Sequence, residues 1–285
     1  MTSTFLSSGQ GTEPQGVKPW RIVLESYDAV RANPNTFFRA VRLPTLLMVV
    51  TVLLALKTYF VCLASYWNSP SVRTASIAIS AVVVGVIVSS LLGALATASV
   101  ARVVRRNSSQ LKGMEARMFA AVLRFLAVGF VGLTLIGAIS EIAAERVAPG
   151  LARFAMWSGC SAALLFIVVL SARCGFLAPA LAATERRSVL RGGWSLSAGH
   201  FWQITIVWIM LTVAPAAVVQ LFGEALIMRV ADASVMTLAE GAKRLAADNL
   251  VLLLIAISLA IAAILSTVMT TIGSFMLGGR LLEQS

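Results

Sequence analysis

The chain has 285 residues, of which 59% are hydrophobic and only 12% are charged, and its mean hydropathy is +0.89. Soluble domains carry about 25% charged residues and rarely contain uncharged runs of about 18 residues or more. This chain contains four such runs, which are residues 74–101, 154–172, 192–223 and 249–279. A single water-soluble domain is therefore excluded, and the composition predicts a protein that lies in a lipid bilayer.

The first 43 residues predict a tail followed by two short helices at the membrane surface. Residues 1–16 are polar, which predicts a disordered cytoplasmic tail. In residues 17–43 a turn is predicted at Asn33 and Pro34, and apolar side chains recur before it at helical spacing. These side chains are Trp20, Leu24, Tyr27 and Val30. We therefore expect residues 17–43 to form a pair of interfacial amphipathic helices.

The rest of the chain, residues 44–285, contains six segments that are long enough to cross a membrane. A hydrocarbon core about 30 Å thick requires roughly 20 helical residues. The predicted spans are 44–66, 75–101, 118–140, 154–176, 201–223 and 249–279. Lys57 interrupts the first span and Arg124 the third, so both are expected inside helices. The expected fold class is all-α, a polytopic six-helix transmembrane bundle with short interfacial helices.

The 23 Lys and Arg residues, which give a formal net charge of +11, are distributed unevenly over this topology. Fifteen fall in the 43 residues before the first span, in the second connection, in the fourth connection with the end of the fourth span, and at the carboxyl end, whereas six fall in the other connections. The positive-inside rule therefore predicts that both termini are cytoplasmic. The excess of Arg over Lys and the high Ala content are typical of a bacterial chain, so we expect a multi-pass inner-membrane protein. Because the charge is spread over short loops, no nucleic acid partner is expected.

Two features inside the predicted spans have more than one interpretation. Lys57 either binds an anionic group or extends its stem outward past Tyr59 and Tyr66, and the second interpretation is favoured. Small residues recur at every fourth position in the second and sixth spans, and the stripes predict close helix packing, with a hydroxyl-lined polar pathway as the alternative. The stripes include Gly85, Ser89, Gly93, Ala262 and Ser266.

The sequence carries no pattern that indicates catalysis. It lacks Walker A, HExxH and GxSxG motifs, and it has a single histidine, His200. His200 is expected to contact lipid head groups, and with Glu185 it would form the one plausible acid–base pair of an enzyme that acts on a lipid. The three cysteines show no metal-binding spacing. We therefore expect neither enzyme activity nor a cofactor or metal.

Residues 173–202 form the most distinctive segment, because arginines alternate there with apolar residues and tryptophan. This composition predicts a short amphipathic element at the cytoplasmic interface. The candidate contacts with anionic lipid are Arg124, Arg173, Arg191 and Trp194. Three further residues are predicted to shape the turn, with a salt bridge from Glu185 to Arg173 or Arg187. The turn residues are Pro179, Glu185 and Arg187.

The run LAPALAATERRSVLRGGWSLSAGHFW, residues 177–202, resembles a known membrane domain. That domain is fused to some bacterial glycerophosphoryl diester phosphodiesterases and also stands alone in inner-membrane proteins. The matching positions are Pro179, Ala180, Glu185, Leu190, Arg191, Trp194, Ser195, Leu196, Gly199, Phe201 and Trp202. Gly192 and Gly193 depart from the Arg and Ser that the family often has there. The resemblance implies a stand-alone membrane domain without the catalytic barrel.

These observations predict a non-enzymatic integral membrane protein that acts as a lipid- or protein-interacting scaffold or accessory subunit. The expected partners are membrane lipids, anionic lipids in particular, together with a protein partner or a second copy of the chain. The alternative is a transporter, or a transporter subunit, for a small molecule or a lipid. That alternative requires a polar cavity that reaches the membrane midplane near Lys57 or the small-residue stripes.

Overall fold

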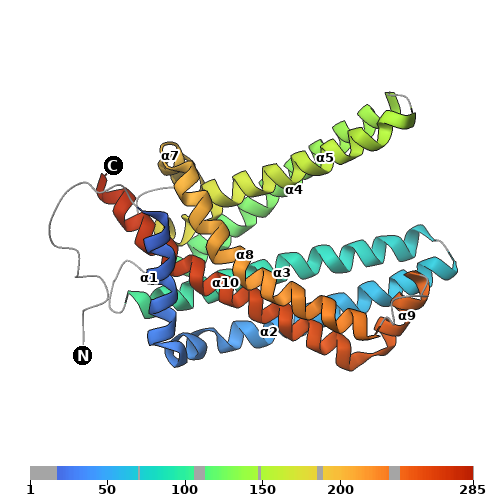
Figure 1. Ribbon diagram of the computed structural model, residues 1–285, viewed down its shortest axis with the longest axis horizontal. Helices are drawn as coiled ribbons and strands as arrows, with labels where there is room; N and C mark the ends of the chain where they lie inside the picture. The colour runs from blue at the N-terminus through green and yellow to red at the C-terminus, as the bar shows by residue number, and fades with distance from the viewer. Residues whose placement is uncertain are drawn as a thin grey trace. The chain divides into compact units, whose positions relative to one another are not determined.

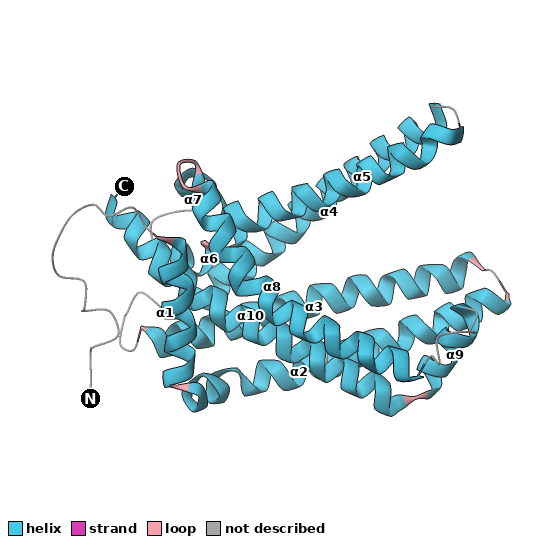
Figure 2. Cartoon of the chain, viewed as in Figure 1, coloured by secondary structure: helices cyan, strands magenta, loops and turns pink. Residues whose placement is uncertain are grey.

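A computed structural model describes residues 18–69, 71–105, 113–146, 149–184, 189–230 and 238–284, and every regular element in these ranges is helical (Figures 1 and 2). The predicted disordered tail, residues 1–16, lies outside the described residues. The elements are α1 (Pro19–Ala32), α2 (Pro34–Asn68), α3 (Val72–Val104), α4 (Met114–Arg146), α5 (Pro149–Leu170), the π-helix η2 (Ser171–Gly175), α6 (Ala178–Ala182), α7 (Val189–Ser197), α8 (Phe201–Val230), α9 (Leu238–Ala247) and α10 (Asn249–Gln284).

Five helical stretches are long and apolar enough to cross a membrane, so the chain is a helical, multi-pass membrane protein. They are Pro34–Tyr66, Val72–Val104, Met114–Ser140, Ser158–Ala182 and Asn249–Leu281. Each overlaps one of the predicted spans. The remaining predicted span falls in α8, where the described apolar residues, Phe201–Thr212, make up only part of a crossing. The sixth crossing therefore stays a prediction.

The helices near the amino terminus differ in one respect from the predicted pair. The chain bends at Asn33, as expected, but residues 34–43 do not form a separate helix. They are the first turns of α2, which continues without a break through Pro44. One buried stripe with helical spacing runs across the proline and keeps these turns in register with the span. The stripe consists of Phe37, Val41, Pro44 and Met48.

The chain divides into two compact units, and α1, α8 and α10 contribute residues to both. Unit 2 comprises residues 25–106 and 209–272. Its main contact is the pairing of α2 with α3, which lie side by side in Figure 1. Gly85 of α3 is buried against Ala55 of α2, and a Cβ atom at Gly85 would lie only 2.8 Å from the Ala55 Cβ. The small residue therefore sets how closely these two helices approach.

Unit 1 comprises residues 1–24, 107–208 and 273–285. In this unit α4 and α5 pack as a hairpin (Figure 1), and η2, α6 and α7 follow at the end of α5. Residues 176–183 are buried, and Ala182 and Ala183 have no exposed surface at all. Residues 176–183 therefore belong to the core of unit 1, and the position of residues 173–202 at the membrane interface stays a prediction.

Candidate functional site

The side chain of Arg173 is held against two aromatic rings. Its guanidinium carbon lies 4.4 Å from the ring centroid of Trp194 in α7 and 5.3 Å from that of Phe201, the first residue of α8. Both distances are within the roughly 6 Å range of cation–π attraction. We call Arg173, Arg191, Trp194 and Phe201 the arginine–aromatic cluster.

The π-helix and a glycine bring these groups together. In η2 the Phe176 N–H donates to the Ser171 carbonyl at 2.9 Å. This bond spans five residues, so the turn that carries Arg173 is wider than an α-helical turn. Gly193 of α7 packs against this widened turn. A Cβ atom at Gly193 would lie 2.8 Å from the Arg173 carbonyl oxygen and 3.3 Å from the Cys174 Cα. Only a residue without a side chain lets α7 approach so closely, and Trp194 follows directly in the chain.

The buried segment beneath the cluster is fixed through its backbone. The Ala180 N–H donates to Ser274 Oγ of α10 at 3.2 Å, and Arg117 Nε of α4 donates to the Ala182 carbonyl at 2.7 Å. These bonds satisfy backbone groups that the short helix α6 leaves without helical partners. Gly278 of α10 allows the same close approach, since its Cβ position lies 2.6 Å from the Ala180 Cβ. Contacts with α4 and α10 therefore hold the buried segment that links Arg173 to α7.

The guanidinium edge of Arg173 is left open. Within the described residues no carboxylate, carbonyl or hydroxyl accepts a hydrogen bond from Arg173, whose side chain is half-buried. Arg191 is exposed and precedes Trp194 by three residues in α7, so the two lie on the same helix face. The arrangement offers planar N–H donors held near two aromatic rings, with a second cation on the same face of α7 as Trp194. Such a group suits the oxygens of a phosphate.

The other predicted site residues of this region are distributed differently. Arg124 is exposed on α4, and the ring of the next residue, Phe125, lies 3.6 Å from the Cβ position of Gly175 in η2. Pro179 is buried in α6. Glu185 and Arg187 lie outside the described residues, as does the predicted Glu185 salt bridge.

His200 is placed at the start of α8. Its Nδ1 atom lies 2.9 Å from Gln203 Oε1, three residues along the chain. Its proposed partner in acid–base chemistry, Glu185, is outside the described residues. Within the described part of the chain, no three His, Cys, Asp or Glu side chains gather in a way that could hold a metal ion.

Lys57 has a partner on another helix of unit 2. Its Nζ atom donates to Asn249 Oδ1 at 2.8 Å. Asn249 is the first residue of α10, whose amino end is capped by Asp248 Oδ1, the acceptor for the N–H groups of Leu250 and Val251. The ammonium group therefore lies level with the beginning of a candidate span. This position agrees better with a lysine that extends toward the surface than with one at the midplane.

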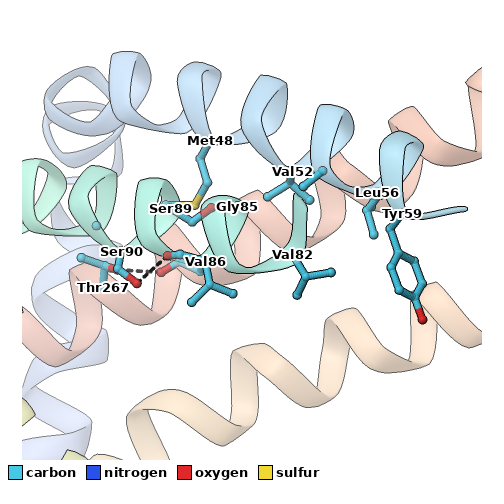
Figure 3. Close-up of a pocket in the computed structure, with 13 residues that line it drawn as sticks. Met48, Val52, Leu56, Tyr59, Val82, Gly85, Val86, Ser89, Ser90 and Thr267 are labelled. Atoms are coloured by element: carbon cyan, nitrogen blue, oxygen red, sulfur yellow. Dashed lines mark hydrogen bonds between the residues drawn. The ribbon is translucent and has the colours of Figure 1, made fainter. Parts of the chain in front are cut away.

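The small-residue stripe of α3 has two different surroundings. Gly85 is in contact with α2, whereas Gly93 has no heavy atom within 4 Å of its Cβ position. Ser89 and Gly93 instead line a cavity of about 640 Å³ together with residues of α2 and α10 (Figure 3). In α10 the stripe residue Ala262 is buried and Ser266 is half-buried, but the neighbouring positions Ala263 and Thr267 line the cavity.

Comparisons with known proteins found no relative of this chain. No family model, no curated protein and no solved structure matches the chain. The resemblance of residues 177–202 to the membrane domain of the phosphodiesterases therefore stays a prediction from the sequence.

Proposed function

We propose that the protein is a non-enzymatic, multi-pass component of a bacterial inner membrane that serves as a lipid-binding scaffold or accessory subunit. It crosses the membrane six times with both termini in the cytoplasm, and α1 and α7 lie at the inner interface. The arginine–aromatic cluster binds the phosphate of anionic lipids. The partners are these lipids, together with a protein subunit or a second copy of the chain.

The observation that carries this proposal is the geometry of Arg173. A guanidinium held near the rings of Trp194 and Phe201 is already restrained, so less entropy is lost when it binds a ligand. Cation–π contacts contribute about 0.5–2 kcal/mol to holding such a cation in place. Each cationic residue near an anionic leaflet adds roughly 1 kcal/mol of attraction. Arg173 and Arg191 together can therefore select anionic lipid over neutral lipid.

Native mass spectrometry of the detergent-solubilised chain tests the proposal. The protein is titrated with phosphatidylglycerol and with phosphatidylcholine, and the occupancy of bound lipid is compared. We expect phosphatidylglycerol to be preferred about thirtyfold, because two cations contribute about 2 kcal/mol of attraction to a lipid with a net negative charge, whereas the choline of phosphatidylcholine cancels the charge of its phosphate. The double substitution Arg173→Ala/Arg191→Ala should abolish the preference. Arg173→Lys should lose most of it, because an ammonium on a flexible stem lacks the planar donors that stack and pair.

The matched control removes the same charge elsewhere. Arg73→Ala/Arg244→Ala also deletes two exposed arginines, from α3 and α9, on the side predicted to be outside. It should keep the preference for phosphatidylglycerol. Equal binding of the two lipids by the wild-type chain, or equal losses in both double variants, would show that the cluster is not the site.

A second candidate function is transport of a lipid or small molecule, and the observation that favours it is the cavity between α2, α3 and α10. Two of its hydroxyl groups are already engaged, since Ser90 and Thr267 donate to carbonyls of their own helices at 2.7 Å. This lining suits an apolar solute better than a polar one. Transport would appear as faster exchange of a fluorescent lipid between the leaflets of vesicles that contain the protein, and a scaffold would leave the exchange rate unchanged.

A further inference from the structure

The cavity of unit 2 lies at the middle of three candidate spans. Its lining residues in α2 extend from Met48 to Tyr59 and those in α3 from Val82 to Gly93, and α10 contributes Ala263 and Thr267 near the centre of Asn249–Leu281. All of these residues belong to unit 2. In the view of Figure 3 the labelled side chains of α2 point toward α3, whereas Val82 and Val86 of α3 point away from α2. The cavity is thus at the depth of the hydrocarbon core.

The lining carries no charge. Nine of the thirteen lining residues are apolar and the other four carry hydroxyl groups, of which Ser90 and Thr267 bond within their own helices. A charged or strongly polar ligand would leave its polar groups unpaired here. Water does not fill apolar cavities of this kind stably, and an empty space forfeits dispersion contacts. Because the lining is uncharged and mostly apolar, the molecule that fits it is also uncharged and apolar.

The dimensions of the cavity fit a hydrocarbon chain. Eleven residue steps separate Met48 from Tyr59, which is about 16 Å at 1.5 Å per residue. One leaflet of a hydrocarbon core about 30 Å thick measures about 15 Å. The volume of about 640 Å³ also falls within the roughly 300–1,000 Å³ of ligand pockets. Val82 and Val86 line the cavity and are 43% and 52% exposed, so its rim is open to the surrounding medium.

We infer that this cavity binds the acyl chain of a membrane lipid, held between α2, α3 and α10 at Gly93. The site is independent of the arginine–aromatic cluster, which binds a head group. The glycine at position 93 keeps the space open, because its missing side chain leaves a gap that no neighbouring atom fills.

A lipid with a photoreactive acyl chain tests this inference. The full chain is placed in nanodiscs of phosphatidylcholine that contain a small fraction of phosphatidylcholine with a diazirine near the end of one acyl chain. After illumination, mass spectrometry locates the labelled residues. We expect labels on the lining residues of α3 and α10, and a several-fold loss of these labels in Gly93→Leu, whose side chain occupies the gap.

Gly137→Leu is the matched control. Gly137 lies in α4, within another candidate span, and also has no heavy atom within 4 Å of its Cβ position. The Gly137→Leu substitution should leave labelling of the cavity unchanged. Ala263→Leu places the same side chain in the cavity from α10 and should reproduce the loss if Gly93→Leu fails to fold.

Three results would overturn the inference. They are the absence of labels in the cavity of the wild-type chain, undiminished labelling in a well-folded Gly93→Leu or Ala263→Leu variant, and equal losses in Gly137→Leu. Cross-linking between two copies through a cysteine introduced at Val86, with no lipid label, would assign the space to a second copy instead. None of these results depends on binding of anionic lipid, so the inference and the proposed function can fail separately.

Discussion

Gly193 and Gly278 of unit 1 differ from Gly93 of unit 2 in what their missing side chains accommodate. In unit 1, Gly193 and Gly278 each face an atom less than 3.0 Å from their Cβ positions, and the space is filled by the protein itself. In unit 2, Gly85 is filled in the same way by Ala55, but Gly93, two turns later, faces open space. In unit 1 the missing side chains of Gly193 and Gly278 therefore allow close packing, whereas in unit 2 the open position of Gly93 lines a cavity.

The arginine–aromatic cluster of unit 1 and the cavity of unit 2 also differ in chemistry. The close packing in unit 1 fixes a guanidinium beside two aromatic rings, an arrangement that suits a charged head group. The open space at Gly93 in unit 2 leaves an uncharged cavity that suits hydrocarbon. If both proposals hold, the cluster would contact the head group of a lipid, where the direction of the donors matters, and the cavity would contact an acyl chain, where only volume matters.

The largest expected effect is at Gly193. In Gly193→Ala the new Cβ would lie 2.8 Å from a backbone carbonyl oxygen, which cannot move as the end of a side chain can. We expect α7 to be displaced and the free energy of unfolding to fall by about 1–3 kcal/mol, as in other overpacked cores. Thermal or denaturant unfolding in detergent micelles measures the loss.

Gly199→Ala is the control for this change. Gly199 lies in the turn after α7 and has open space at its Cβ position. Its substitution should change stability by less than about 0.5 kcal/mol, as at ordinary surface positions. If Gly193→Ala were as stable as Gly199→Ala, the close contact of α7 with η2 would be wrong, and so would the support that it gives to Arg173.

Smaller changes in the free energy of unfolding, of opposite sign, are expected for substitutions at Gly85 and Gly93. Gly85→Ala brings two Cβ atoms to 2.8 Å and should separate α2 from α3, with a net loss of about 1 kcal/mol. Gly93→Ala meets no atom, so the removal of a flexible helix glycine should stabilise the chain by about 0.5–1 kcal/mol. Unfolding of both variants under identical conditions gives the sign of each. The same sign in both would erase the distinction between packed and open glycines.

The membrane spans were predictable because long apolar runs have few alternatives in any fold. Five of the six predicted spans overlap helices that are long and apolar enough to cross a membrane. The start of α2 was not predictable from the sequence, because Pro34 and Pro44 both suggest helix boundaries. The first proline stands at the first turn, where its missing N–H is harmless, and the buried stripe carries the helix past the second.

The sequence indicated Arg173, Arg191 and Trp194 of the cluster but not Phe201, and it did not indicate their geometry. Arg173 and Trp194 both stand out in the sequence, but their contact depends on a π-helix and on the docking of Gly193, for which the sequence gives no local signal. Residues 176–183 have the same apolar composition whether they lie at an interface or in a core. Gly85 and Gly93 likewise occupy equivalent positions of one stripe, and only the position of α2 distinguishes them.

The smallest expected effect concerns the bond between Lys57 and Asn249, which joins α2 to α10. Polar bonds between membrane helices contribute about 0.6 kcal/mol on average, because partners are also found in the unfolded state. A double-mutant cycle with Lys57→Met and Asn249→Ala should therefore give a coupling of about 0.5 kcal/mol in unfolding experiments. A coupling near 2 kcal/mol would mean that Lys57 is far more desolvated than its exposed position indicates. An intramembrane anion site would then be the better interpretation of this residue, and unit 2 would resemble unit 1 in having a charged group fixed for a ligand.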